Sequence, residues 1–227
     1  MTMEGRTIRP SSVVDALHVV CVAAGDLDAP SELVSALPAD CRATFFVVQH
    51  LRAGAKKRLV EALAERTTLP VIQAHDGLVA AQGHIYVIPP TGTLALAARR
   101  IHITPLASVL AAPADTLFTS LAVELGPSLI GVVLSGGGAD GALGIRAIRH
   151  GGGTTFAQYP GSARFPGMPI TAIETGCVDF VLRPNEIAGA LTRVSTPAVL
   201  SAIRAGNRIA GGPYPDSVET MALCARS

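Results

Sequence analysis

The chain has 227 residues, of which 49% are hydrophobic and 15% charged, and its formal net charge is +1. This length and composition indicate one folded domain of ordinary to large size and exclude a disordered chain. With so little net charge, and with no basic run longer than Lys56-Lys57-Arg58, we expect no nucleic-acid partner.

The chain is apolar but has no candidate membrane span. Its most apolar stretch, Val13–Gly25, is interrupted by Asp15 and His18. Because the first residues also lack the apolar core and cleavage site of a signal peptide, we expect a cytoplasmic protein.

The four cysteines are Cys21, Cys41, Cys177 and Cys224. Their spacing does not match a metal site, so we expect reduced thiols, no metal and no cofactor.

Strand-like and helix-like segments alternate along most of the chain. The predicted strands are His18–Ala23, Ala43–Val48, Leu69–Ile72, His84–Ile88, Leu129–Leu134, Thr154–Ala157 and Val178–Leu182. The predicted helices are Ala29–Ala36, Ala55–Arg66, Ala114–Leu125, Ala142–His150, Thr171–Thr175 and Asn185–Val194. This order predicts an α/β fold built on a doubly wound, mostly parallel sheet of about seven strands, with helices on both faces.

The segment between residues 93 and 104 breaks this alternation. Thr93–Ala97 and Ile101–Thr104 flank Arg99-Arg100 and are predicted to form an antiparallel hairpin at the edge of the sheet. Residues 17–194 then form the α/β domain, after an N-terminal extension of residues 1–16. Residues 195–227 are predicted to hold one short helix and a poorly ordered tail.

Polar side chains follow two of the predicted strands at their carboxyl ends, where open α/β sheets bind ligands. His50 follows Gln49, and a histidine there could act as a general base or simply end the strand. Asp140 stands in a glycine-rich turn before a helix, where an aspartate commonly caps a helix but could also orient an imidazole. The first strand ends in VVCVAA, so Cys21 is its only reactive side chain.

Taken in order, these segments resemble the catalytic domain of the chemotaxis protein-glutamate methylesterases, the CheB family. The resemblance covers about Leu17 to Val194 and rests on VVQH, DG…G-x-IYVIPP, PADTLF, GVVLSGGGADGALG, GMP-x-x-AI and G-x-VDFVL. It implies an α/β domain that hydrolyses glutamyl methyl esters, and deamidates some glutamines, on receptor signalling helices. It also implies a protein partner, either a methyl-accepting receptor helix or another signalling protein.

The family uses a Ser-His-Asp triad, and the resemblance assigns the acid to Asp140 and the base to His50. The family's serine lies in Gly-Ala-Ser-Thr-Gly-Gly after the first strand. Counting back without gaps from Leu37-Pro38 places that serine on Ala23, and a shift by one residue places it on Ala24. Either way, the resemblance implies a site with its base and acid but without its nucleophile.

The surroundings of this site differ from the family as well. The resemblance assigns substrate binding to Gly137, Gly138 and Met168, and where the family has Thr-Gly-Met-Gly this chain reads Ser135-Gly136-Gly137-Gly138. The family's His-Met-Pro-Pro-Gly reads His50-Leu51-Arg52-Ala53-Gly54, and its His-Arg-Pro-Ser reads Leu110-Ala111-Ala112-Pro113. About sixteen residues precede the first strand, too few for the family's receiver domain, so we expect control by a separate partner or by an unknown fusion context.

The leading hypothesis is a degenerate methylesterase domain that has lost esterase catalysis and acts by binding a protein. The second is an active methylesterase or glutamine deamidase with an unconventional nucleophile. Cys21 is the nearest candidate, displaced by about 6.6 Å along the strand from Ala23. Asp26 could activate a water with His50, although capping the next helix suits it better. Ser135 would need a rearranged site to serve.

The third hypothesis is a nucleotide-binding module. Gly136, Gly138 and Gly141 satisfy the dinucleotide pattern G-x-G-x-x-G. The match lacks the acidic residue that should follow about twenty positions on, because no Asp or Glu occurs between Asp140 and Glu174. We therefore rank this hypothesis last.

Overall fold

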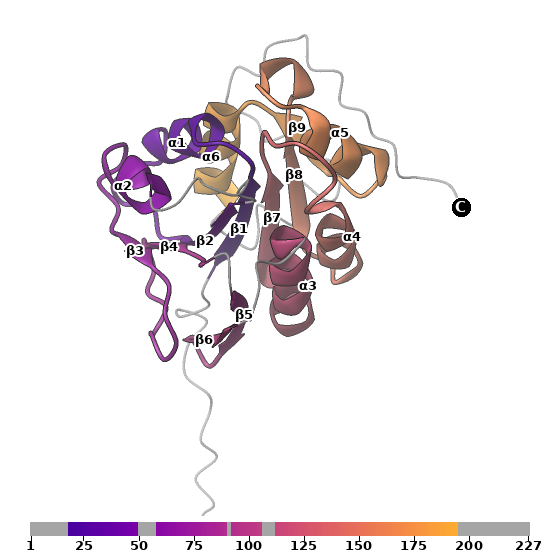
Figure 1. The fold of residues 1–227 in the computed structure, drawn as a ribbon. Coiled ribbons are helices and arrows are strands. Elements are labelled where there is room, and N and C mark those ends of the chain that lie inside the picture. The colour runs from indigo at the N-terminus through magenta and orange to yellow at the C-terminus, as the bar shows by residue number, and fades with distance from the viewer. Residues whose placement is uncertain (1–17, 50–57, 90–91, 106–111, 195–227) are drawn as a thin grey trace, which may run out of the picture.

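The computed structural model describes residues 18–49, 58–89, 92–105 and 112–194. The predicted N-terminal extension, the C-terminal helix and tail, and His50 lie outside the described residues. Seven strands form one parallel sheet, in the order β3-β4-β2-β1-β7-β8-β9 (Figure 1). They are β1 (Val19–Ala24), β2 (Thr44–Gln49), β3 (Val71–Gln73), β4 (Ile85–Val87), β7 (Leu129–Val133), β8 (Thr154–Gln158) and β9 (Phe180–Leu182).

Helices cover both faces of this sheet. They are α1 (Asp28–Ser35), α2 (Arg58–Ala64), α3 (Pro113–Leu125), α4 (Ala142–His150), α5 (Gly167–Glu174) and α6 (Pro184–Val194), with short 3₁₀ turns at Gly126–Ser128 and Pro160–Ser162. The predicted doubly wound α/β fold is confirmed. No helix of the described residues is long and apolar enough to cross a membrane.

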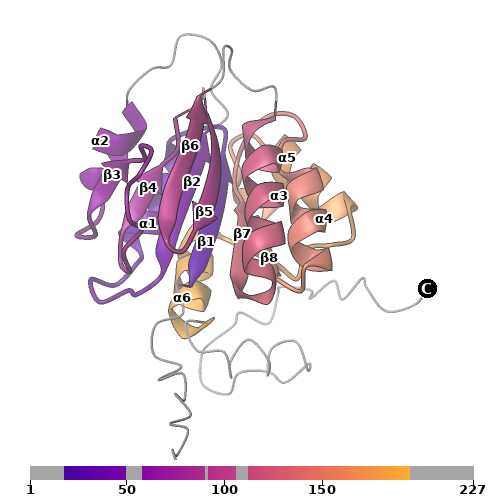
Figure 2. The ribbon, with the colours of Figure 1, turned by 90° about the horizontal axis from the view of Figure 1, so that it is seen from below.

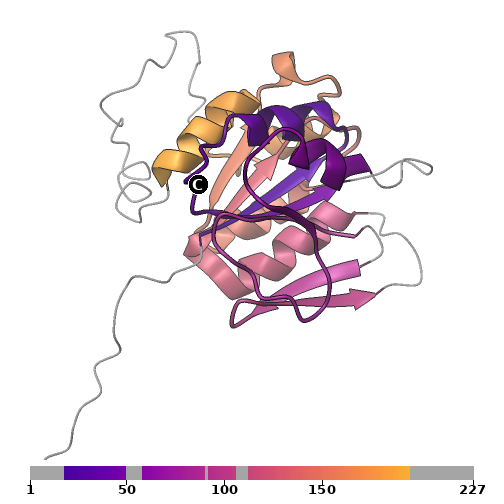
Figure 3. The same cartoon turned by 90° about the vertical axis from the view of Figure 1, so that its left-hand side faces the viewer.

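The central strand β1 shows why two cores form. Its side chains alternate between the faces of the sheet, so that Val20, Val22 and Ala24 join the core beneath α1, α2 and α6. Val19, Cys21 and Ala23 join the core beneath α3, α4, α5 and the hairpin. Figure 3 shows the layers from the side, with α1, α2 and α6 on one face and α3 on the other. Every residue of β1 is buried because both faces are covered.

The predicted hairpin forms a small sheet of its own. β5 (Gly92–Ala97) and β6 (Arg100–Pro105) pair antiparallel, joined by Ala98 and Arg99 in the left-handed region. The hairpin does not extend an edge of the main sheet but packs against α3, as Figure 2 shows. Ser120 donates to the Leu94 carbonyl (2.7 Å), which fixes that contact.

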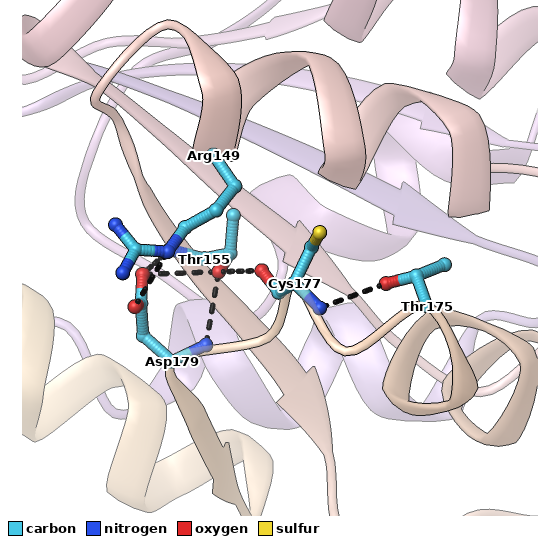
Figure 4. A network of polar contacts seen from close by, with 5 residues as sticks. All are labelled: Arg149, Thr155, Thr175, Cys177 and Asp179. Atoms are coloured by element: carbon cyan, nitrogen blue, oxygen red, sulfur yellow. Dashed lines mark hydrogen bonds and ion pairs between the residues drawn. The ribbon is translucent and has the colours of Figure 1, made fainter. Parts of the chain in front are cut away.

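The VDFVL motif has a structural role at the amino end of β8. Asp179 accepts hydrogen bonds from the backbone N–H (3.0 Å) and hydroxyl (3.1 Å) of Thr155, and it pairs with Arg149 at 3.2 Å (Figure 4). Thr155 also donates to the Cys177 carbonyl (2.6 Å). β9 therefore begins only at Phe180, two residues later than predicted, because the preceding residues turn to meet β8.

Candidate functional site

The order in which the chain adds strands to the sheet reverses between β1 and β7. From β1 the chain builds β2, β4 and β3 on one side, and then returns to add β7, β8 and β9 on the other. The loops after β1 and β7 thus leave toward opposite faces of the sheet, and ligands of open α/β folds bind in the crevice at this point. Ala23 and Asp140 both lie there, one at the end of β1 and the other in the loop after β7.

Ala23 is completely buried and faces the layer formed by α3 and α4. A Cβ built on Gly141 would lie 3.8 Å from the Cβ atoms of both Ala23 and Ala114, so Ala23 lies against the starts of these two helices. Ala24 faces the opposite core. Of the two candidate nucleophile positions, only Ala23 therefore faces the side of the sheet where Asp140 is held.

Asp140 is fixed by the N-terminus of α3. Its carboxylate accepts hydrogen bonds from the backbone N–H groups of Ala114 (3.1 Å) and Asp115 (3.0 Å). In return, Asp115 accepts hydrogen bonds from Gly141 (3.0 Å) and Gly144 (2.8 Å) at the start of α4. The first N–H groups of a helix have no partner within the helix. Asp140 accepts from those of α3, and Asp115 accepts from those at the start of α4. Asp140 thus caps α3, a helix whose Ala114 precedes it in the chain by 26 residues.

Burial raises the pKa of Asp115, and the neighbouring Asp140 carboxylate raises it further against the lowering effect of the backbone N–H donors. The folded state therefore holds this proton to a higher pH than the unfolded chain does. It follows that the contribution of Asp115 to stability is greatest in acid and falls as pH rises through the raised pKa.

We expect the free energy of unfolding of the wild type, relative to that of Asp115→Asn, to fall as pH rises from about 4 toward neutrality. The Asn variant cannot titrate, so it removes the dependence. Urea unfolding at several pH values measures the difference. A constant difference between the wild type and Asp115→Asn would contradict the pKa shift.

Three loops are tied together beside Asp140. The Asp26 carboxylate accepts hydrogen bonds from the Ser135 hydroxyl and from the backbone N–H of Ala29 (3.1 Å). Ser135 in turn accepts a hydrogen bond from the Phe165 N–H (3.0 Å). The Gly25 N–H donates to the Ser135 carbonyl (2.8 Å). The expectation that Asp26 caps α1 is confirmed, and the same side chain also joins the β1 loop to the β7 loop.

Gln158 supports this site from the end of β8 and was missed by sequence reasoning. Its side-chain oxygen accepts from the Ser135 N–H (2.8 Å), and its side-chain nitrogen donates to the Ser162 hydroxyl (3.2 Å). Its only sequence signal is that a polar amide stands at the end of a strand whose residues are all buried. Asp115 was likewise passed over, although PADTLF carries it.

The glycine loop is packed on one side and open on the other. Gly136 lies against Met168, whose sulfur would be 2.1 Å from a Cβ built at Gly136, and Met168 itself is buried. Gly137 and Gly138 are exposed, and a Cβ at either would meet nothing within 4 Å. Substrate binding by Gly137, Gly138 and Met168 stays a prediction, with the two exposed glycines the accessible members.

The alternative nucleophiles are poorly placed for attack. Cys21 is completely buried, and burial raises the pKa of its thiol, so the reactive thiolate is suppressed. Ser135 is 1% exposed, and its hydroxyl is engaged by Asp26 and Phe165. Both carboxylate oxygens of Asp26 already accept hydrogen bonds. His50 lies outside the described residues; β2 ends at the preceding Gln49, which lies opposite Ala24 in register.

Known proteins are similar to this chain in fold and in sequence. The family described as CheB methylesterase matches residues 18–191. The crystal structure of the Thermotoga maritima CheB methylesterase catalytic domain superposes with a TM-score of 0.73 at 27% identity, covering 79% of this chain and all of that one.

Curated relatives are longer than this chain. A protein-glutamate methylesterase/protein-glutamine glutaminase of Moorella thermoacetica is 35% identical over 74% of this chain and 41% of its own length. The protein-glutamate methylesterase FrzG of Myxococcus xanthus is 32% identical, over 77% and 53% respectively. An uncharacterized 104.1 kDa protein of Rhodobacter capsulatus is 40% identical over 53% of this chain and 13% of that protein. The chain spans about half the length of most curated relatives it matches.

Proposed function

Because the chain belongs to the CheB methylesterase family, we propose that it is a chemotaxis-type methylesterase-like domain that has lost its nucleophile and acts by binding a methyl-accepting receptor helix. The observation that carries this proposal is the alanine methyl group at position 23. It faces the start of α3, where Asp140 is held in place by two backbone N–H groups.

An alanine at the nucleophile position removes the group that attacks the ester. In triad enzymes, loss of the nucleophile alone lowers turnover about a millionfold, because nucleophile and base act as a unit. Binding and oxyanion stabilisation survive such a loss, at roughly 10³- to 10⁴-fold over water. A domain in this state keeps a shaped surface for the substrate without converting it.

The alternative of an active esterase needs another nucleophile at this edge. The buried Cys21 thiol, the engaged Ser135 hydroxyl and the two engaged oxygens of Asp26 argue against the three candidates within the described residues. The nucleotide-binding alternative rested on Gly136, Gly138 and Gly141. Local structure explains all three glycines without a nucleotide. A Cβ at Gly136 would collide with Met168, while Gly138 and Gly141 have φ values of +90° and +97°, which favour glycine.

Direct binding tests the proposal. A receptor-helix peptide carrying glutamyl methyl esters should give a saturable heat when titrated into the purified protein. Gly137→Phe should abolish that heat, because Gly137 is exposed with open space at its Cβ, so a ring there covers the exposed face of the glycine loop without disturbing the core.

The matched control is Val123→Phe on the last turn of α3, where the side chain is 87% exposed. It lies about nine residues, or roughly 14 Å, along the helix from the end that holds Asp140. It should bind the peptide like the wild type. If the wild type gives no heat, or if Gly137→Phe and Val123→Phe bind equally well, receptor-helix binding at this edge is wrong.

A further inference from the structure

Asp26 places a carboxylate at the site where the resemblance to the family assigns glycine. It is half-buried, three residues after Ala23, in the loop that joins β1 to α1. Three residues of chain limit the distance between the Cα atoms of Ala23 and Asp26 to at most about 11 Å. The Leu134 N–H donates to the Ala23 carbonyl (2.8 Å), and the next residue, Ser135, donates its hydroxyl to Asp26, so the carboxylate is bonded to the strand end that pairs with Ala23.

The carboxylate is also held in place. One oxygen accepts from the Ala29 N–H at the start of α1, and the other accepts from Ser135. Ser135 is itself fixed by Phe165 and by Gln158, so the side chain cannot swing away without breaking several contacts. A helix N-terminus and a hydroxyl are donors suited to an anion. Here both are taken by the protein's own carboxylate.

A fixed negative charge opposes ester hydrolysis by a serine. In that reaction the serine oxygen bonds to the carbonyl carbon, its proton passes to the base, and the carbonyl π electrons move to oxygen. The resulting oxyanion then reforms the carbonyl, the bond to the alkoxy oxygen breaks, and the base returns its proton to the leaving alcohol. Water hydrolyses the acyl-enzyme by the same two steps and frees the serine. The transition state gains negative charge, so a nearby carboxylate raises its energy, and the donors that Asp26 occupies are not available to offset this.

We propose that Asp26 is a second obstacle to ester hydrolysis, independent of the missing hydroxyl at position 23. This inference rests on the proposed function, since it concerns the same site. Asp26 acts on the reaction through its charge and through the donors it occupies, and restoring serine alone leaves that obstacle in place.

The test compares variants that all carry Ala23→Ser. Hydrolysis of p-nitrophenyl acetate is followed for Ala23→Ser alone and for its combinations with Asp26→Asn, Asp26→Gly and Asp28→Asn. Asp26→Asn keeps the size of the side chain and removes its charge. Asp28→Asn is the matched control, because Asp28 is two residues away but points to solvent and Arg164 (3.3 Å). Thermal unfolding of each variant reports any loss of the fold.

We expect kcat/KM to rise roughly tenfold or more when Asp26→Asn is added to Ala23→Ser, and not to rise with Asp28→Asn. Adding Asp26→Gly to Ala23→Ser should raise kcat/KM as far or further, even though this variant loses a helix cap and unfolds at a lower temperature. A purely structural role would instead make both Asp26 variants slower. Equal rates for Ala23→Ser with and without the Asp26 changes, whether high or undetectable, would overturn the inference. The proposed function is judged separately, on receptor binding by the wild type.

Discussion

The purified protein should hydrolyse p-nitrophenyl acetate about a millionfold more slowly than a CheB methylesterase that has its serine. The reason is local. Asp140 is held at the start of α3. The β1 side chain that faces this end of the helix is the methyl group of Ala23. Under the proposed function, this methyl group occupies the nucleophile position and offers nothing that could attack the carbonyl.

Cys21→Ala should leave the residual rate unchanged. The Cys21 thiol is completely buried and its pKa is raised, so it does not supply a thiolate. The folded protein should accordingly take up iodoacetamide at the partly exposed Cys177 and not at Cys21. A rate within a hundredfold of a serine-bearing relative that disappears in Cys21→Ala would instead establish a cysteine esterase.

Gly25→Ala should lower the free energy of unfolding by about 3 kcal/mol or more. A Cβ at residue 25 would lie 2.5 Å from the Cα of Gly136. The loops cannot easily separate, because the Gly25 N–H donates to the Ser135 carbonyl at 2.8 Å. The substitution therefore forces apart the β1 and β7 loops, and urea unfolding monitored by circular dichroism measures the loss.

Gly137→Ala is the matched control for this effect. It lies in the same glycine loop, but a Cβ there meets nothing within 4 Å. Its free energy of unfolding should stay within about 0.5 kcal/mol of the wild-type value. Equal stability of Gly25→Ala and Gly137→Ala would mean that the β1 and β7 loops do not touch as the structure describes.

The sequence alone was enough for the main sheet. Buried runs such as VVCVAA and LIGVV have no polar alternation, which is typical of parallel strands covered on both faces, and they became β1 and β7. The pattern was less informative at element ends. α5 begins at Gly167, four residues before the predicted start, because Pro169 is tolerated in the first turn of a helix.

The position of the hairpin could not be read from its sequence. Leu94, Leu96 and Ile101 are buried in alternation, which indicates one covered face but not what covers it. The cover is α3, and both edges of the seven-stranded sheet are other strands, β3 and β9. The choice between an edge and a face depends on tertiary packing, which no local pattern records.

The site was predictable only in its parts. Resemblance and position in the strand order assigned Ala23 and Asp140 to the site, and their catalytic roles stay predictions. The exchange of caps between Asp115 and Asp140 joins residues 25 apart in the chain, and the bond between Asp26 and Ser135 joins residues 109 apart. Such contacts depend on which loops the fold brings together, so no local sequence pattern predicts them.

The most direct measurement is methanol release from an intact methylated receptor incubated with the wild-type protein and, in parallel, with His50→Ala. We expect no methanol above the uncatalysed rate from either protein, while the receptor stays bound with its methyl esters intact. If the wild type releases methanol and His50→Ala does not, the protein is an active esterase that depends on His50. That result would contradict the proposed loss of esterase catalysis.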